Sequence, residues 1–175
     1  DYSTPSSATG SSTGGTPTTE TITGTSLDLA LSAHVSISRT RTGLTFNTGA
    51  IPVGDDVTSV SFWLKKVGSP TGTIYARVYD SGGTQVTEFG RIDVSTLTTS
   101  YVKYTFNSAS RTVVAGDRLV IVYGGTDGSN YIHVQYAQAS GHDADLTRGV
   151  GYEGTTWTNW TAGDDMHMEY IHDAV

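Results

Sequence analysis

Apolar and polar residues alternate along much of the chain after residue 56, which is the pattern of β-strands that bury one face. In one segment Val60, Phe62 and Leu64 occupy alternate positions. Because successive side chains of a strand point to opposite faces of its sheet, each such segment predicts a half-buried strand. The same alternation recurs at residues 74–79, 101–106, 131–136 and 166–170, and in the run 119–123 Leu119, Ile121 and Tyr123 form one face, with Val120 and Val122 on the other.

Glycine-rich turn signals separate the predicted strands. The stretch from Gly68 to Gly72 follows the first of them, and Asp80-Ser81-Gly82-Gly83 is a hairpin sequence after the second. No stretch keeps a helical period over ten residues. Eight or more short strands joined by such turns predict an all-β fold, a jelly-roll β-sandwich.

The N-terminal segment has a different composition from the rest of the chain. Residues 1–26 consist mostly of Ser, Thr, Gly and Pro, so they have too little apolar surface to fold alone. The next residues, Leu27-Asp28-Leu29-Ala30-Leu31, alternate with strand period. We predict an N-terminal arm over 1–26, with a candidate donor strand that continues to residue 31, and a sandwich domain over 27–175. A short helix from Ser26 to Ala33, capped by Ser26, is the alternative here.

The apolar residues of this arm are the predicted subunit interface. A strand that adds to another subunit's sheet edge gains backbone hydrogen bonds, and its apolar side chains add ~1.5–3 kcal/mol each when fully buried. Such head-to-tail contacts propagate into an open polymer. They also require a groove in the sandwich that its own chain does not fill. The predicted anchors are Ile22, Leu27, Leu29 and Leu31.

Composition indicates a protein that works outside the cell. Only 15% of the residues are charged, against ~25% in an ordinary domain, and the net charge of −7 argues against a nucleic-acid surface. The chain has no cysteine, which favours a prokaryotic or viral exterior protein over a small secreted eukaryotic domain. No window approaches the ~18 apolar residues of a membrane-spanning helix. The first residue is Asp1, which we expect to follow a removed leader.

Two resemblances sharpen these predictions. Five features occur together in the sequence: the stretch from Val60 to Gly72, residues 74–80, Ala115-Gly116-Asp117, Ser129-Asn130-Tyr131, and a final Trp157 before Asp165. In this combination the chain resembles a jelly-roll domain of microbial and phage surface proteins. The resemblance covers roughly residues 44–172. The domain that it indicates is similar in architecture to carbohydrate-binding modules. It implies a fold and no particular ligand. The layout of arm and sandwich also resembles extracellular filament subunits that are joined by donor strands.

An enzyme is not expected from these residues. There is no cysteine nucleophile, and no serine lies in a Gly-x-Ser-x-Gly sequence. The five histidines are scattered, and His167 and His172 are five residues apart on one predicted segment, which suits no shared metal. Most carboxylates lie in predicted turns, where Asp is favoured by local hydrogen bonds.

Calcium is the one candidate ion, because oxygen ligands are abundant in the predicted loops. No run matches an EF-hand loop, so the alternative remains that these acids are turn formers and caps. The candidate ligands are Asp127, Asp143, Asp145, Asp164 and Asp165.

Aromatic residues on the predicted outer faces are candidates for sugar stacking. Exposed rings equally mark protein interfaces, and a neighbouring sheet or subunit that covers them is the alternative. Asn159-Trp160-Thr161 is an N-glycosylation sequon, which places Asn159 in an exposed loop if it is used. The candidate stacking residues are Trp63, Tyr75, Trp157 and Trp160.

These observations favour a structural subunit of an extracellular polymer, such as a pilus-like filament, tube or sheath, built by insertion of the N-terminal strand into the neighbouring subunit. Its partners would be copies of itself, with glycans as further candidates. The alternatives are an extracellular carbohydrate- or receptor-binding module, and a viral capsid or decoration protein.

Overall fold

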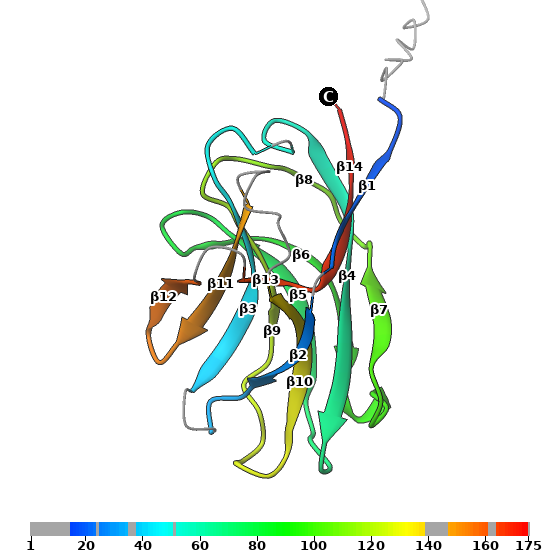
Figure 1. Cartoon of the computed structure of the whole chain (residues 1–175), viewed down its shortest axis with the longest axis vertical. Helices are drawn as coiled ribbons and strands as arrows, with labels where there is room; N and C mark the ends of the chain where they lie inside the picture. The colour runs from blue at the N-terminus through cyan, green and yellow to red at the C-terminus, as the bar shows by residue number, and fades with distance from the viewer. Residues whose placement is uncertain are drawn as a thin grey trace, which may run out of the picture.

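Two antiparallel β-sheets packed face to face make up the structure (Figure 1). The computed structural model describes residues 15–23, 25–34, 38–50, 52–138, 147–160 and 164–174. In these ranges the chain forms fourteen strands and one short 3-10 helix, η1 (Val94–Thr96). The predicted all-β sandwich is therefore confirmed, while a jelly-roll order of its strands is not established by this arrangement.

The larger sheet, called sheet A, has eight strands, and the smaller one, sheet B, has six. Sheet A contains β1 (Thr18–Ile22), β2 (Thr25–Leu31), β4 (Asp56–Val67), β7 (Val102–Phe106), β8 (Arg111–Thr112), β10 (Tyr131–Gln138), β13 (Asp164–Met166) and β14 (Met168–Asp173). Sheet B contains β3 (Arg39–Phe46), β5 (Thr73–Tyr79), β6 (Gln85–Asp93), β9 (Arg118–Val122), β11 (Thr147–Glu153) and β12 (Thr156–Asn159), in the order β12-β11-β3-β9-β5-β6.

The core lies between the inner faces of the two sheets, where the alternating apolar residues of the sequence meet. Phe62 and Leu64 of β4 are fully buried, as are Ile74 of β5 and Leu119 and Ile121 of β9. Strands β4, β5, β7, β9 and β10 coincide with segments in which the alternation predicts strands. This agreement follows from the apolar side chains at the core-facing positions of each strand, which recur at every second residue.

Sheet A is divided where the last strands of the chain enter it. Strand β10 pairs with β4 through Tyr131–Val134 and with β13 through Tyr136–Gln138, while β4 pairs with β14 through Asp56–Phe62. Between β13 and β14, the His167 amide donates to the Gln135 carbonyl oxygen of β10 at 3.2 Å. The final segment of the chain therefore separates β10 from β4 along part of their length and leaves two outer edges, one on β10 and one on β14.

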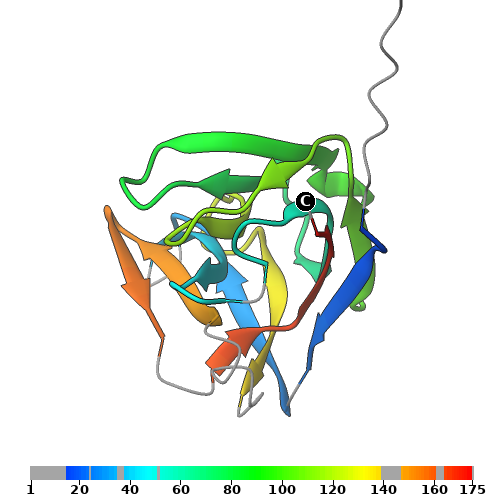
Figure 2. The ribbon, with the colours of Figure 1, turned by 90° about the horizontal axis from the view of Figure 1, so that it is seen from above.

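The N-terminal strands cover these two edges. β1 pairs with β14 from Thr18–His172 to Ile22–Met168, and β2 pairs with β10 along its whole length. Figure 2 shows β1 beside the C-terminal strand at the margin of the sandwich. The end of the predicted arm is a strand, as expected, and not a helix. The expectation of a groove that its own chain does not fill is wrong, because β1 and β2 occupy that edge themselves.

One glycine is required by the close approach of two strands of sheet B. A Cβ atom added at Gly43 of β3 would lie 1.9 Å from the Leu119 carbonyl oxygen of β9. No side chain fits at that distance, so a larger residue would force the two central strands apart.

Truncation of the buried anchor of β2 should destabilise the fold far more than truncation of an exposed leucine on the same strand. We expect Leu31→Ala to lower the free energy of unfolding by about 2–5 kcal/mol, because it leaves a cavity in a fully packed site. Leu27→Ala removes the same atoms at a position that is 37% exposed, and should cost well under half as much. Urea unfolding of both variants measures the difference, and equal losses would contradict the docking of β2 described here.

Candidate functional site

The predicted interface residues lie on β1 and β2 and form a graded contact with the core of their own chain. Ile22 is 1% exposed and Leu31 is 0% exposed, so the last residue of each of the two strands is fully anchored. Leu29 is half-buried against the core, and Leu27 is 37% exposed. Ile22 thus docks on the β14 edge and the three leucines on the β10 edge, and their role between subunits stays a prediction.

Polar contacts fix β2 on the outer face of sheet A. The Asp28 carboxylate accepts hydrogen bonds from Lys65 Nζ and from the Tyr101 hydroxyl, each at 2.8 Å. The Lys65 hydrogen bond is the main reason why the pKa of Asp28 lies below its usual value. Burial, together with the bond to this carboxylate, raises the pKa of the Tyr101 hydroxyl. Asp28 thus connects the N-terminal strand to β4 and to the turn before β7.

Three histidines of the described part of the chain contact the N-terminal strands. His133 Nδ1 lies 3.3 Å from Asp28 Oδ2, and His167 Nδ1 lies 3.5 Å from Ser26 Oγ. His172 is hydrogen-bonded to Asp55 at 2.8 Å, and its other ring nitrogen is 3.7 Å from Glu20 of β1. Burial is the main cause that lowers the pKa of His133, and it also lowers that of His167.

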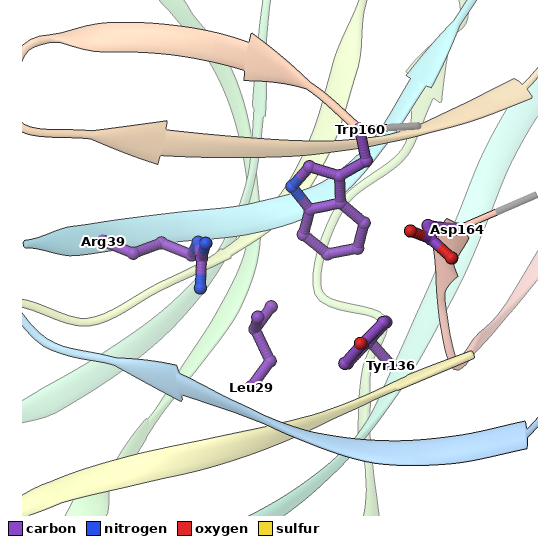
Figure 3. A pocket seen from close by; sticks show the side chains of 5 residues that line it. All are labelled: Leu29, Arg39, Tyr136, Trp160 and Asp164. Carbon is purple, nitrogen blue, oxygen red and sulfur yellow. The ribbon is translucent and has the colours of Figure 1, made fainter. Parts of the chain in front are cut away.

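A pocket of about 170 Å³ lies beside Leu29, where the two sheets separate (Figure 3). The rings of Trp160 and Tyr136 meet edge to face there, with their centroids 5.7 Å apart. Arg39 and Asp164 supply charged groups to the lining, and Arg39 Nε donates to Glu153 at 3.0 Å. Leu29 thus lines the pocket, whereas Leu31 of the same strand is fully buried in the core.

The candidate calcium ligands do not converge in the described part of the chain. No group of three or more acidic or histidine side chains there is placed to hold a metal ion. The Asp127 carboxylate accepts from the amides of Ser129 and Asn130 at 2.7 and 2.8 Å, so it shapes its own loop. Asp164 lines the pocket and Asp165 is fully buried. Asp143 and Asp145 lie outside the described residues, and calcium binding stays a prediction.

The four candidate stacking rings are in different surroundings. Trp63 lies against His167, with ring centroids 4.4 Å apart, and Tyr75 is covered by the Arg77 guanidinium at 3.8 Å. Trp160 belongs to the pocket. Trp157 packs against Tyr79 and Tyr152, with centroids at 5.5 and 5.0 Å. The four rings therefore do not form one continuous surface. Asn159 is exposed at the end of β12, and its glycosylation stays a prediction.

Sequence reasoning missed the arginines that accompany Trp157. Arg41 of β3 lies over Tyr79 and Tyr152, and Arg118 of β9 lies over Trp157. Arg41 meets these rings because it is opposite Tyr152 in the β3–β11 register. The unusual run Arg39-Thr40-Arg41 in a chain with few cations was the available signal.

No helix among the described residues has the length and hydrophobicity to cross a membrane.

Acidification should weaken the fold through His133 and His167. Their pKa values in the folded protein lie below the ordinary 6.5, so the unfolded chain binds more protons over the interval between the two values. The free energy of unfolding should therefore fall as the pH drops from 6.5 toward the lowered pKa values, and these two groups contribute no loss above that interval. Urea unfolding at several pH values across this range measures the effect.

The double variant His133→Gln, His167→Gln should show a smaller loss of stability on acidification than the original protein. His34→Gln provides the control, because His34 lies on an exposed turn and should keep the full loss. An undiminished loss in the double variant would show that burial of these two rings is not its cause.

Comparison with known proteins gives little further information. No family model and no curated protein sequence matches the chain. Among solved structures, a chain from "Bacillus endospore appendages form a novel family of disulfide-linked pili" matches with 14% sequence identity and a TM-score of 0.34. The match covers 90% of this chain and 88% of that chain. A likeness at this score supports no conclusion about the function of this protein.

Proposed function

We propose that the protein is a structural subunit of an extracellular polymer, and that β1 and β2 join it to its neighbour by strand exchange. The observation that carries the proposal is the position of these strands. They precede the other strands in the sequence, they cover the β14 and β10 edges of sheet A, and they hold Ile22 and Leu31 fully buried.

Exchange of these strands would preserve nearly every contact of the single chain. An identical β1–β2 segment from a second copy can make the same ladders with β14 and β10, so the exchanged state has little energetic cost. The hydrogen bonds at the start of the connection to β3 would change on exchange. In the closed chain, Ser32 N donates to Arg39 O at 2.6 Å, and Ala33 N donates to Gly124 O at 2.8 Å.

A chain whose N-terminal strands have left the sheet is driven to pair again. Its β14 and β10 would present unpaired amides and carbonyls, and the sites of Ile22 and Leu31 would be open to water. Each fully buried side chain of this kind stabilises the docked state by ~1.5–3 kcal/mol. When each subunit donates its strand pair to one neighbour and accepts a pair from another, the contact is head-to-tail and continues along a polymer.

The length of the connection allows such an exchange. Seven residues, 32–38, join β2 to β3, and fully extended they would span about 23 Å at ~3.3 Å per residue. That reach is sufficient to place β2 on a subunit in direct contact. A low content of charged residues and an abundance of Ser, Thr and Gly agree with an exterior location.

Engineered disulfides can report which copy supplies β1. Thr19 of β1 is the register partner of Ile171 of β14, and the chain has no native cysteine. The variant Thr19→Cys, Ile171→Cys should give a ladder of covalent oligomers on a non-reducing gel after oxidation of assembled protein. Electron microscopy of the same sample should show filaments, tubes or sheaths.

The matched control is Ser61→Cys, Thr105→Cys, which joins β4 to β7 within one chain in either state. It should give a single monomeric band from the same polymers. Polymers in which the engineered β1–β14 disulfide lies within one chain would overturn strand exchange through β1, and protein that stays monomeric at all concentrations would overturn the polymer itself.

A further inference from the structure

The outer face of sheet B carries a concentration of arginines that contrasts with the net charge of −7 of the chain. In β3, β5 and β9, the residues that alternate with the core-facing residues point to this outer face. Glu88 pairs there with Arg77 at 2.8 Å and lies 3.7 Å from Arg91. The arginines of these strands and of β6 that lie on the face are Arg41, Arg77, Arg91 and Arg118.

Arg41 and Arg118 differ from the other two arginines, because no carboxylate among the described residues lies within ion-pair distance of either. The Arg41 guanidinium carbon is 4.3 Å from the ring centroid of Tyr79 and 4.1 Å from that of Tyr152. The Trp157 centroid is 5.5 Å from Arg41 and 4.9 Å from Arg118, so the indole ring lies between the two cations.

These contacts fix the guanidinium groups and leave hydrogen-bond donors unused. A guanidinium carries five N–H donors in its plane, and stacking on a ring uses its faces only. No described group accepts a hydrogen bond from the Arg41 side chain. Arg118 Nη1 donates to the Asp80 carbonyl at 2.7 Å, whereas Arg118 Nε is buried without a partner. Arg118 Nη1 also donates to the Ser81 carbonyl at 3.2 Å, so the donors without a described acceptor that remain for a ligand are those of Arg41 and of Arg118 Nη2, both next to the Trp157 ring.

A planar carboxylate is the anion that matches this arrangement. Guanidinium binds carboxylate through two parallel hydrogen bonds in one plane, which needs in-plane donors such as those left free here. The half-buried rings of Tyr152 and Trp157 flank the two cations and can contact the apolar face of a sugar.

We propose that Arg41 and Arg118, together with Tyr152 and Trp157, bind an acidic polysaccharide through the carboxylate of a uronic acid. The site lies on the outer face of sheet B, away from the edge of sheet A at which β1 and β2 dock. Binding of an acidic glycan is therefore independent of strand exchange, and each can fail without the other.

Affinity for polygalacturonate and for its fully methyl-esterified form tests the proposal on the full chain. The ester keeps the pyranose rings and removes the charge, so it should bind at least tenfold more weakly. Arg41→Gln should weaken binding of polygalacturonate by roughly ten- to hundredfold, the range for loss of a charge-assisted paired hydrogen bond. Arg41→Lys keeps the charge without the planar donors and should fall between the original protein and Arg41→Gln.

Arg91→Gln is the matched control, because Arg91 lies on the same face, carries the same charge and is outside the ring cluster. It should retain the original affinity within about twofold, since an exposed charge contributes little. Thermal unfolding of each variant shows whether it is folded. Equal losses in Arg91→Gln and Arg41→Gln would overturn the site, as would equal affinity for the methyl ester. Binding of polyglutamate or single-stranded DNA as tight as that of polygalacturonate would overturn the assignment to a sugar acid.

Discussion

The backbone groups at the outer edges of β10 and β14 must find hydrogen-bond partners, and the rest of the architecture depends on how this is done. Because the last strands of the chain enter sheet A between β10 and β4, two edges have to be covered, and one N-terminal segment covers both. The same segment brings Ile22 and Leu31 into the core. Edge pairing and core completion are therefore one event, which makes these strands decisive for stability and for any exchange between copies.

The contacts of the N-terminal strands differ in kind along their length. At Leu31 the strand is held by full burial in the core, whereas near Leu27 it is held mainly by polar groups around Asp28. Buried apolar contacts change little with solution conditions, but the contacts of Asp28 and of the neighbouring histidines respond to pH and salt. The N-terminal strands are thus held by apolar burial next to their connection with β3. Around Asp28 they are held by contacts that depend on pH and salt.

Sequence patterns could predict the strands but not their neighbours. Alternation is clear at β4 and β5, since apolar side chains occupy the core-facing positions at every second residue. It is obscured in β3 and β11, where Gly43, Gly149 and Gly151 replace side chains. The docking of β1 on its own sheet was missed because edge pairing uses backbone groups, which are alike in every segment. The ring cluster at Trp157 was missed for a related reason, since Arg41 meets Tyr152 only through the register of β3 and β11.

The two outer faces of the sandwich use their cations differently, and this difference separates assembly from ligand binding. On sheet A, Lys65 pairs with Asp28 and Lys103 with Glu169, so the lysines serve the cohesion of the sheet. On sheet B, aromatic rings hold Arg41 and Arg118, and the donors of the Arg41 side chain have no acceptor among the described residues. Growth of a polymer through the edge of sheet A would leave the outer face of sheet B uncovered by the joining strands. Each subunit could then present the same arginine pair, and a repeating acidic polymer would meet a repeating array of sites, for which linked contacts raise the overall affinity above that of one site.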